Sequence, residues 1–176
     1  GSIDTVKVNA SHDVSVFDFQ PDIEEKTLVH NPDLMRVENL RGYRSLYRFD
    51  FSKLPKDATI HQAYLSLDFD ADQSEIFKDG IILDLLPIYA DSVWTPDQIR
   101  VDSTGFTPSE VVNESDPKIQ FTSPTAIQTM TAIVQNIIAE SETNYGFLMQ
   151  SRHSGLDPAH LSIYTGAVDS TRVPRL

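Results

Sequence analysis

Cationic and aromatic side chains gather in one short stretch of this otherwise acidic chain. Five of the 14 lysines and arginines lie between positions 36 and 53, although the whole chain carries a formal net charge of -12. A guanidinium group matches a carboxylate or sulfate with two parallel hydrogen bonds, as the recognition of uronic-acid polysaccharides would require. The stretch therefore indicates a ligand-binding surface, for which the candidate residues are Arg41, Tyr43, Arg44 and Arg48.

Three further candidates for ligand binding lie outside this stretch. Trp94 opens a long polar segment, and Arg152 and His153 follow a segment of strand character. An exposed aromatic ring can stack on a sugar ring. Other interpretations stay open, because the arginines could pair instead with acids such as Glu38 and a single tryptophan often belongs to a core.

Three aspartates, Asp68, Asp70 and Asp72, stand at alternate positions and are candidates for a metal site. On a strand this spacing would place the three carboxylates on one face. Calcium takes 6–8 oxygen ligands, which clustered carboxylates commonly supply, so the pattern indicates a Ca²⁺ site. The alternative is a solvated strand end whose charges keep the strand edge from pairing with another chain.

Catalytic motifs are absent from the sequence. The chain has no cysteine, no Gly-x-Ser-x-Gly or His-Glu-x-x-His pattern, and its five histidines are scattered. We therefore predict a protein that is not an enzyme. A polysaccharide lyase or hydrolase remains an alternative, because carboxylate pairs are abundant in a chain with 26 acidic residues.

The elements that must position these residues are mostly short strands. Apolar and polar residues alternate from Tyr43 to Phe51, so that Arg44, Leu46 and Arg48 fall on the face opposite the core. Thr59–Phe69 alternates equally well, and we expect this segment to form a strand beside the Tyr43–Phe51 strand. Further strands are predicted at Ile3–Val8, Val14–Phe19, Ile81–Ala90 with Pro87 at an edge or bulge, Tyr145–Ser151, Leu161–Thr165 and Val173–Leu176.

Two segments differ from this pattern. The polar stretch from Trp94 to Lys118 is predicted to be a long surface excursion. From Ser123, a good N-cap, and Pro124 onward, apolar residues recur three and four positions apart until Glu140. The second segment is therefore predicted to be an amphipathic helix that packs on the core across one end of a β-sandwich.

Length and charge limit the classes of protein that fit. A chain of 176 residues suits one domain, and its negative charge disfavours nucleic acid as a partner. No apolar run is long enough to insert into a membrane. We interpret Gly1-Ser2 as a remnant of cloning and the chain as one domain of a larger exported protein, with its signal sequence and neighbouring domains outside this sequence.

Two parts of the chain together resemble a known family. The run from Tyr43 to Pro55, with Ala58-Thr59-Ile60 and Ala63-Tyr64-Leu65 after it, is similar to a run in the disaggregatase-related repeat (DNRLRE) domains. The helix up to Ile138, Asn144–Ser151 and Arg172–Leu176 resemble that family's C-terminal pattern in order and spacing. The sequence departs from the family around Trp94-Thr95-Pro96, where a threonine-tryptophan pair is common.

The resemblance implies an all-β, antiparallel jelly-roll sandwich of a bacterial or archaeal surface or secreted protein. It also implies a carbohydrate-binding module, since some members bind acidic polysaccharides. Because function depends on sites rather than on the fold, this expectation is an analogy. The alternative from another class is a structural spacer in a multidomain surface protein.

Overall fold

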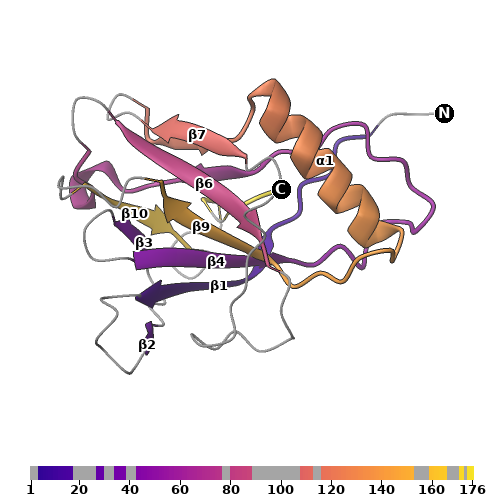
Figure 1. Cartoon of the computed structure of the whole chain (residues 1–176), viewed down its shortest axis with the longest axis horizontal. Coiled ribbons are helices and arrows are strands. Elements are labelled where there is room, and N and C mark those ends of the chain that lie inside the picture. Colours follow the sequence, from indigo (N-terminus) through magenta and orange to yellow (C-terminus); the bar gives the residue numbers. More distant parts are fainter. Residues whose placement is uncertain are drawn as a thin grey trace.

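The structure, a computed structural model, describes residues 4–17, 27–29, 34–38, 43–76, 80–88, 108–112, 116–152, 159–165, 171–172 and 174–176. These residues form a mostly β structure with one α-helix (Figure 1). The elements are β1 (Ala10–Phe17), β2 (Thr27–Val29), β3 (Leu34–Glu38), β4 (Tyr43–Phe49), β5 (Ser66–Asp68), the 3-10 helix η1 (Ala71–Gln73), β6 (Ile81–Pro87), β7 (Ser109–Val112), β8 (Lys118–Gln120), α1 (Pro124–Ile138), β9 (Phe147–Ser151) and β10 (His160–Tyr164).

Six strands form one curled antiparallel sheet in the order β2-β1-β4-β9-β6-β7. The register places Leu46 opposite Leu148, and Leu148 opposite Leu86 on its other side. In Figure 1, β1, β4, β9 and β6 lie side by side, and α1 lies at one end of these strands. Strands that are distant in sequence are thus neighbours in the sheet, and β9 occupies a central place.

The other four strands pair as β10 with β3 and β5 with β8. The two pairs are linked by a bridge between Phe69 and Ile163 and by a hydrogen bond of 2.8 Å from Asp70 N to Ser162 O. Their inward side chains, such as Leu161 and Ile163, share one core with side chains of the six-stranded sheet. This arrangement is compatible with a β-sandwich.

The alternation predicted for Tyr43–Phe51 is confirmed by β4. Tyr47 and Phe49 are fully buried in the core, while Arg44 and Arg48 are half-buried on the other face. The predictions at Tyr145–Ser151, Leu161–Thr165, Ile81–Ala90 and Val14–Phe19 correspond to β9, β10, β6 and β1. A period of two in hydrophobicity is sufficient to locate β4, whereas β6 follows from its dense apolar run.

The prediction that Thr59–Phe69 lies beside β4 is wrong. Only Ser66–Asp68 is a strand, and it pairs with β8, whereas the neighbours of β4 are β1 and β9. The inward residues were predicted well, since Leu65, Leu67 and Phe69 are buried. The segment before Ser66 is extended without a strand partner because side chains of α1 bind its backbone, as described below.

Three other predictions need correction. The excursion from Trp94 to Lys118 contains β7 and the first residue of β8, although much of it lies outside the described residues. Residues 4–8 form no strand, and in the described part of the last segment only Arg175 is bridged, to Asn9 and to Ser66. Backbone hydrogen bonds of 2.9 Å in both directions still join Val8 and Leu176. The paired segments contain too few residues for a periodic pattern to reveal them.

The predicted helix is confirmed as α1. Ser123 Oγ accepts a hydrogen bond of 3.2 Å from Ala126 N, and Pro124 opens the helix. Its buried residues recur every four positions, which is the stripe that a helix turns toward a core. None of the helices in the described part of the chain has the length and apolar character needed to cross a membrane. The buried residues are Ala126, Met130, Val134 and Ile138.

Candidate functional site

The six-stranded sheet has one face in the core and another that we call the second face. Side chains alternate along a strand, so the neighbours of core residues in sequence fall on the second face. Its described residues are Arg44, Leu46 and Arg48 on β4, Leu148, Gln150 and Arg152 on and after β9, Ile82, Asp84 and Leu86 on β6, and Ser109 and Val111 on β7.

The middle of the second face is an apolar row. Leu46, Leu148 and Leu86 are neighbours in register, and they are exposed by only 0%, 1% and 4%. All three lie outside the main core cluster. Because this row is buried, the accessible part of the second face is the end where β6, β7 and β9 carry polar residues.

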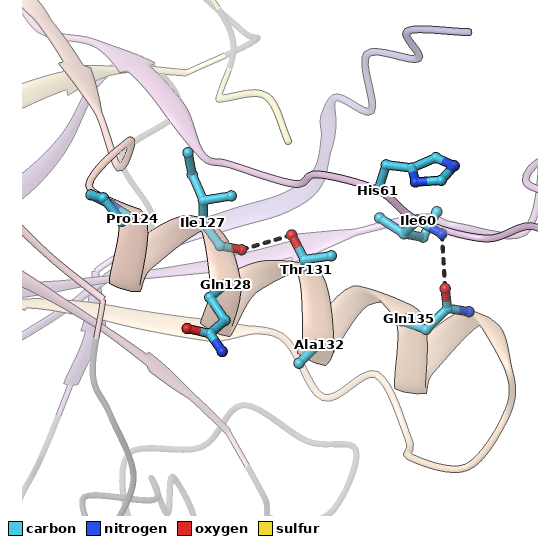
Figure 2. Close-up of a pocket in the computed structure, with 8 residues that line it drawn as sticks. All are labelled: Ile60, His61, Pro124, Ile127, Gln128, Thr131, Ala132 and Gln135. Carbon is cyan, nitrogen blue, oxygen red and sulfur yellow. Dashed lines mark hydrogen bonds between the residues drawn. The ribbon is translucent and has the colours of Figure 1, made fainter. Parts of the chain in front are cut away.

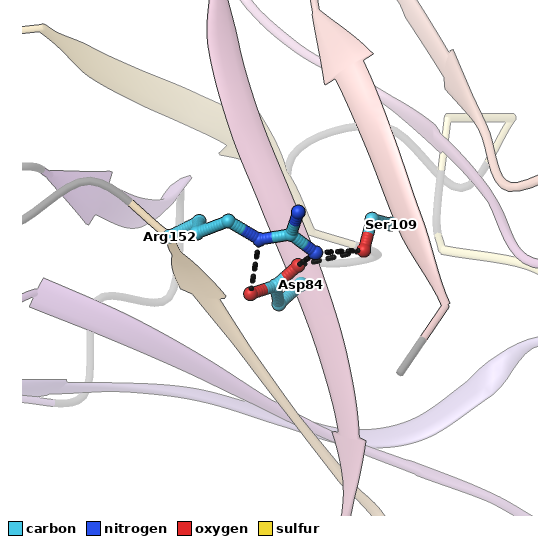
Figure 3. Close-up of polar contacts among 3 residues, drawn as sticks. All are labelled: Asp84, Ser109 and Arg152. Atoms are coloured by element: carbon cyan, nitrogen blue, oxygen red, sulfur yellow. Dashed lines mark hydrogen bonds and ion pairs between the residues drawn. The ribbon is translucent and has the colours of Figure 1, made fainter. Parts of the chain in front are cut away.

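That end holds a compact polar cluster of Asp84, Arg152 and Ser109 (Figure 3). Arg152 Nε donates to Asp84 Oδ2 at 3.1 Å, and Arg152 Nη2 donates to Asp84 Oδ1 at 2.7 Å. Ser109 Oγ donates to Asp84 Oδ1 at 2.8 Å and accepts from Arg152 Nη2 at 2.5 Å. Two strands and the residue after a third thus converge on one ion pair.

Backbone pairing fixes the positions of these three residues. Asp84 lies opposite Ser109 on β7 and opposite Gln150 on β9. Arg152 N donates to Ile82 O at 2.9 Å, which carries the ladder one residue beyond β9. Strand pairing rather than loops therefore holds the cluster.

The two members of the Asp84–Arg152 ion pair differ in their exposure to solvent. The side chain of Asp84 is 12% exposed, whereas that of Arg152 is 49% exposed. Burying a carboxylate is costly unless a cation and hydrogen bonds compensate it, and Arg152 supplies both. The hydrogen bond to Asp84 and its negative charge raise the pKa of the Arg152 guanidinium. The pair thus stabilises a buried charge and also presents a cationic group to solvent.

The structure brings some of the predicted ligand-binding residues together. Arg44 precedes Ser45, the partner of Met149, so it lies toward the same end of the second face as Gln150 and Arg152. Arg48 lies toward the opposite end, where its Nη2 donates to Tyr145 O at 3.5 Å. Tyr43 begins β4, but its side chain is outside the described part, as are the whole of Arg41, Trp94 and His153.

The predicted arrangement of Asp68, Asp70 and Asp72 on one strand face is wrong. The strand ends at Asp68, and Asp72 lies in the 3-10 helix η1. Asp70 caps this helix, since its Oδ1 accepts from Asp72 N at 3.0 Å and from Gln73 N at 3.3 Å. Among the described residues, no group of three or more acidic or histidine side chains is placed to hold a metal ion. The Ca²⁺ site stays a prediction.

A second polar cluster, which the sequence did not indicate, surrounds Tyr164 on β10. The guanidinium carbon of Arg172 lies 4.7 Å from the centre of the Tyr164 ring, a cation–π distance. Burial and a hydrogen bond with Asp70 raise the pKa of the Tyr164 hydroxyl, and Arg172 acts in the opposite direction. Since Arg172 already covers this ring, the cluster is a weaker candidate for stacking on a ligand.

A groove of about 450 Å³ runs along α1 (Figure 2). Two of its four polar side chains are already used, since Gln135 Oε1 accepts from Ile60 N at 2.8 Å and Thr131 Oγ1 accepts from Ala63 N at 3.0 Å. The other two, His61 and Gln128, are exposed. The groove therefore offers a ligand few hydrogen-bonding groups, and we regard the Asp84 cluster as the better candidate. The lining residues are Ile60, His61, Pro124, Ile127, Gln128, Thr131, Ala132 and Gln135.

Sequence reasoning missed Asp84 and Ser109. A usable signal existed for Asp84, because it is the one charged residue in the apolar run from Ile81 to Ile88. A charge in such a run must be paired or functional. Ser109 carried no comparable signal, since it lies in a segment with many serines and threonines.

Comparisons with known proteins do not assign the chain to a family. No family model matches it, and no curated protein matches it significantly in sequence. The resemblance to the disaggregatase-related repeat domains therefore stays a prediction.

Proposed function

We propose that this protein is a non-catalytic, extracellular carbohydrate-binding or adhesion module with a jelly-roll sandwich fold. The observation that carries the proposal is the cluster of Asp84, Arg152 and Ser109, which holds a half-exposed guanidinium group at the accessible end of the second face. Hydrogen-bonding groups fixed on a rigid sheet suit the recognition of sugar hydroxyls and acidic groups.

The surroundings of this cluster support binding. Gln150, Asp84 and Ser109 lie in register across three strands, and Arg44 lies toward the same end. The side chain of Val111 on the neighbouring edge strand is 49% exposed and supplies an apolar surface. Polar donors beside an apolar patch are what a sugar ring, with its polar edge and apolar face, would contact.

The contacts of the Asp84 side chain support a role in binding rather than in catalysis. Both of its oxygens accept hydrogen bonds, and Arg152 balances its charge. A general acid or base must lie within hydrogen-bond reach of the substrate atom with which it exchanges a proton, whereas both oxygens of this largely buried side chain face Arg152 and Ser109. The carboxylate of this site is thus poorly suited to act as a proton donor.

A glycan array with and without Ca²⁺, followed by affinity gels on alginate, pectin, chitin and cellulose, tests the proposal. We expect retardation by at least one polysaccharide and a loss of about tenfold or more in affinity for Arg152→Ala, with a smaller loss for Arg44→Ala. Lys56→Ala is the matched control, because it removes an exposed cation that pairs with Glu140 instead of lying on the second face.

Each contrary outcome points to a different alternative. Absence of binding across the whole panel, with a folded protein, would favour the structural spacer. Release of reducing sugar or unsaturated uronate from a polysaccharide would overturn the non-catalytic assignment in favour of a hydrolase or lyase.

A further inference from the structure

We infer that Arg152 is a pre-oriented donor for an uncharged oxygen of the glycan, a hydroxyl or an amide carbonyl, rather than a binding point for a carboxylate or sulfate. Asp84 and Ser109 are the residues that position it. This inference rests on the proposed function and names its ligand chemistry. It differs from the expectation of an acidic polysaccharide, which came from the arginines around β4.

The guanidinium group of Arg152 has more N–H donors than its protein partners use. Arginine has five N–H groups. Arg152 directs three of them inward, one from Nε and two from Nη2, to Asp84 and Ser109. Within the described part of the chain no hydrogen bond reaches Nη1, and Figure 3 shows this third nitrogen directed away from the carboxylate. Two N–H groups on a half-exposed side chain therefore remain for a ligand.

The guanidinium group of Arg152 is held in one orientation before a ligand binds. A free arginine side chain loses much rotational freedom when it binds, and this loss weakens the affinity. Here the bidentate pair with Asp84 and the contact with Ser109 fix the guanidinium plane before any ligand arrives. Asp84 is itself held between β7 and β9 by backbone pairing. The donor edge of Arg152 is thus fixed relative to the sheet.

The balance of charge between Arg152 and Asp84 decides the class of ligand. Asp84 lies in direct contact with the guanidinium and cancels its charge, so the pair is neutral overall. A carboxylate or sulfate at Nη1 would gain from Arg152 but would be repelled by Asp84 and by a chain with a net charge of -12. A hydroxyl or carbonyl oxygen accepts the same two N–H groups without that repulsion.

Isothermal titration calorimetry with defined oligosaccharides tests this inference. The neutral probes are cellohexaose and chitohexaose, and the anionic probes are hexagalacturonate and hexamannuronate, each at 50 and 500 mM NaCl. We expect binding of a neutral probe with a Kd that changes less than about twofold between the two salt concentrations, because no net charge is neutralised. Arg152→Gln should weaken this binding by about tenfold or more.

Two further variants separate positioning from general structural damage. Asp84→Asn keeps an oxygen that can accept from Arg152 but removes the negative charge, so it should give measurable, salt-sensitive binding of hexagalacturonate. Ser109→Ala should weaken neutral binding about threefold to tenfold and leave the insensitivity to salt unchanged. A purely structural role for Asp84 would lower all binding together and create no new preference. If Asp84→Asn does not fold, Ser109→Ala still provides the test.

The outcomes distinguish this inference from the proposed function. Binding confined to the anionic probes and weakened by salt would overturn the inference while leaving a carbohydrate-binding module in place. Binding of a neutral probe that Arg152→Gln does not change would also overturn it. Failure to bind any probe here or any polysaccharide in the wider panel would overturn both.

Discussion

The side-chain amide of Gln135 binds the main chain on both sides of Thr59. Its Oε1 accepts from Ile60 N at 2.8 Å, and its Nε2 donates to Ala58 O at 3.1 Å. One turn earlier, Thr131 Oγ1 accepts from Ala63 N. Helix α1 therefore takes the place of a neighbouring strand for this extended segment, which explains why the alternating residues before Ser66 do not join a sheet.

Gln135→Ala should lower the free energy of unfolding by about 1–3 kcal/mol, because it leaves partly buried backbone groups without partners. Gln128→Ala is the matched control, since Gln128 is exposed on the same helix, and its effect should stay within about 0.5 kcal/mol. Urea unfolding followed by circular dichroism measures both. Equal effects of the two substitutions would contradict the strand-like role of Gln135.

Ser123→Ala should destabilise the protein by about 0.5–2 kcal/mol, because the N-cap bond to Ala126 N is lost. Ser123→Asp should restore most of this loss, as an aspartate also caps and its charge favours the helix N-terminus. Thermal unfolding of the three proteins checks the order. A loss in Ser123→Asp as large as that in Ser123→Ala would show that the cap bond is not the cause.

Asp70→Ala should lower the free energy of unfolding by about 1 kcal/mol in EDTA as well as in Ca²⁺, because Asp70 caps η1 through its own carboxylate. Differential scanning calorimetry at 5 mM of either reagent checks this. Asp72→Ala is the comparison, since the exposed Asp72 side chain makes none of the capping bonds. A loss that appears only with Ca²⁺ would instead support the metal site predicted from Asp68, Asp70 and Asp72.

Glu110→Gln should raise Tm at pH 7 and leave it unchanged near pH 3. Burial raises the pKa of the Glu110 carboxyl above its ordinary value of 4.5, against the backbone hydrogen bonds from Val111 and Thr122. A raised folded-state pKa gives a contribution to stability that is complete below the unfolded pKa and lost as the pH rises through the folded pKa. Glu75→Gln, at an exposed glutamate, is the matched control. A higher Tm for Glu110→Gln at both pH values would point to a cause other than charge.

Local patterns predicted the elements better than their partners. The alternation in β4 and the capped, four-residue stripe of α1 are consequences of one buried face, so the sequence contains them directly. The pairing of β5 with β8 depends instead on which distant segment offers a free edge. No period within one segment carries that information.

The candidate site shows the same limit. Arg152 was identified as a binding residue, but its partners lie 68 positions away at Asp84 and 43 positions away at Ser109. Their proximity arises only when β6, β7 and β9 become neighbours. Asp84 could have been noticed as a charge within an apolar run, whereas the geometry that makes Arg152 a fixed donor could not.

The central place of β9 has a consequence for how the chain reaches its native state. β9 separates β4 from β6, yet it is made about 100 residues after β4, so a ribosome must release most of the chain before the sheet can close. Until then both flanking strands keep open edges that can pair with other molecules. Contacts between such distant segments also slow folding, typically to milliseconds or seconds. Such a chain would need protection from aggregation during that interval.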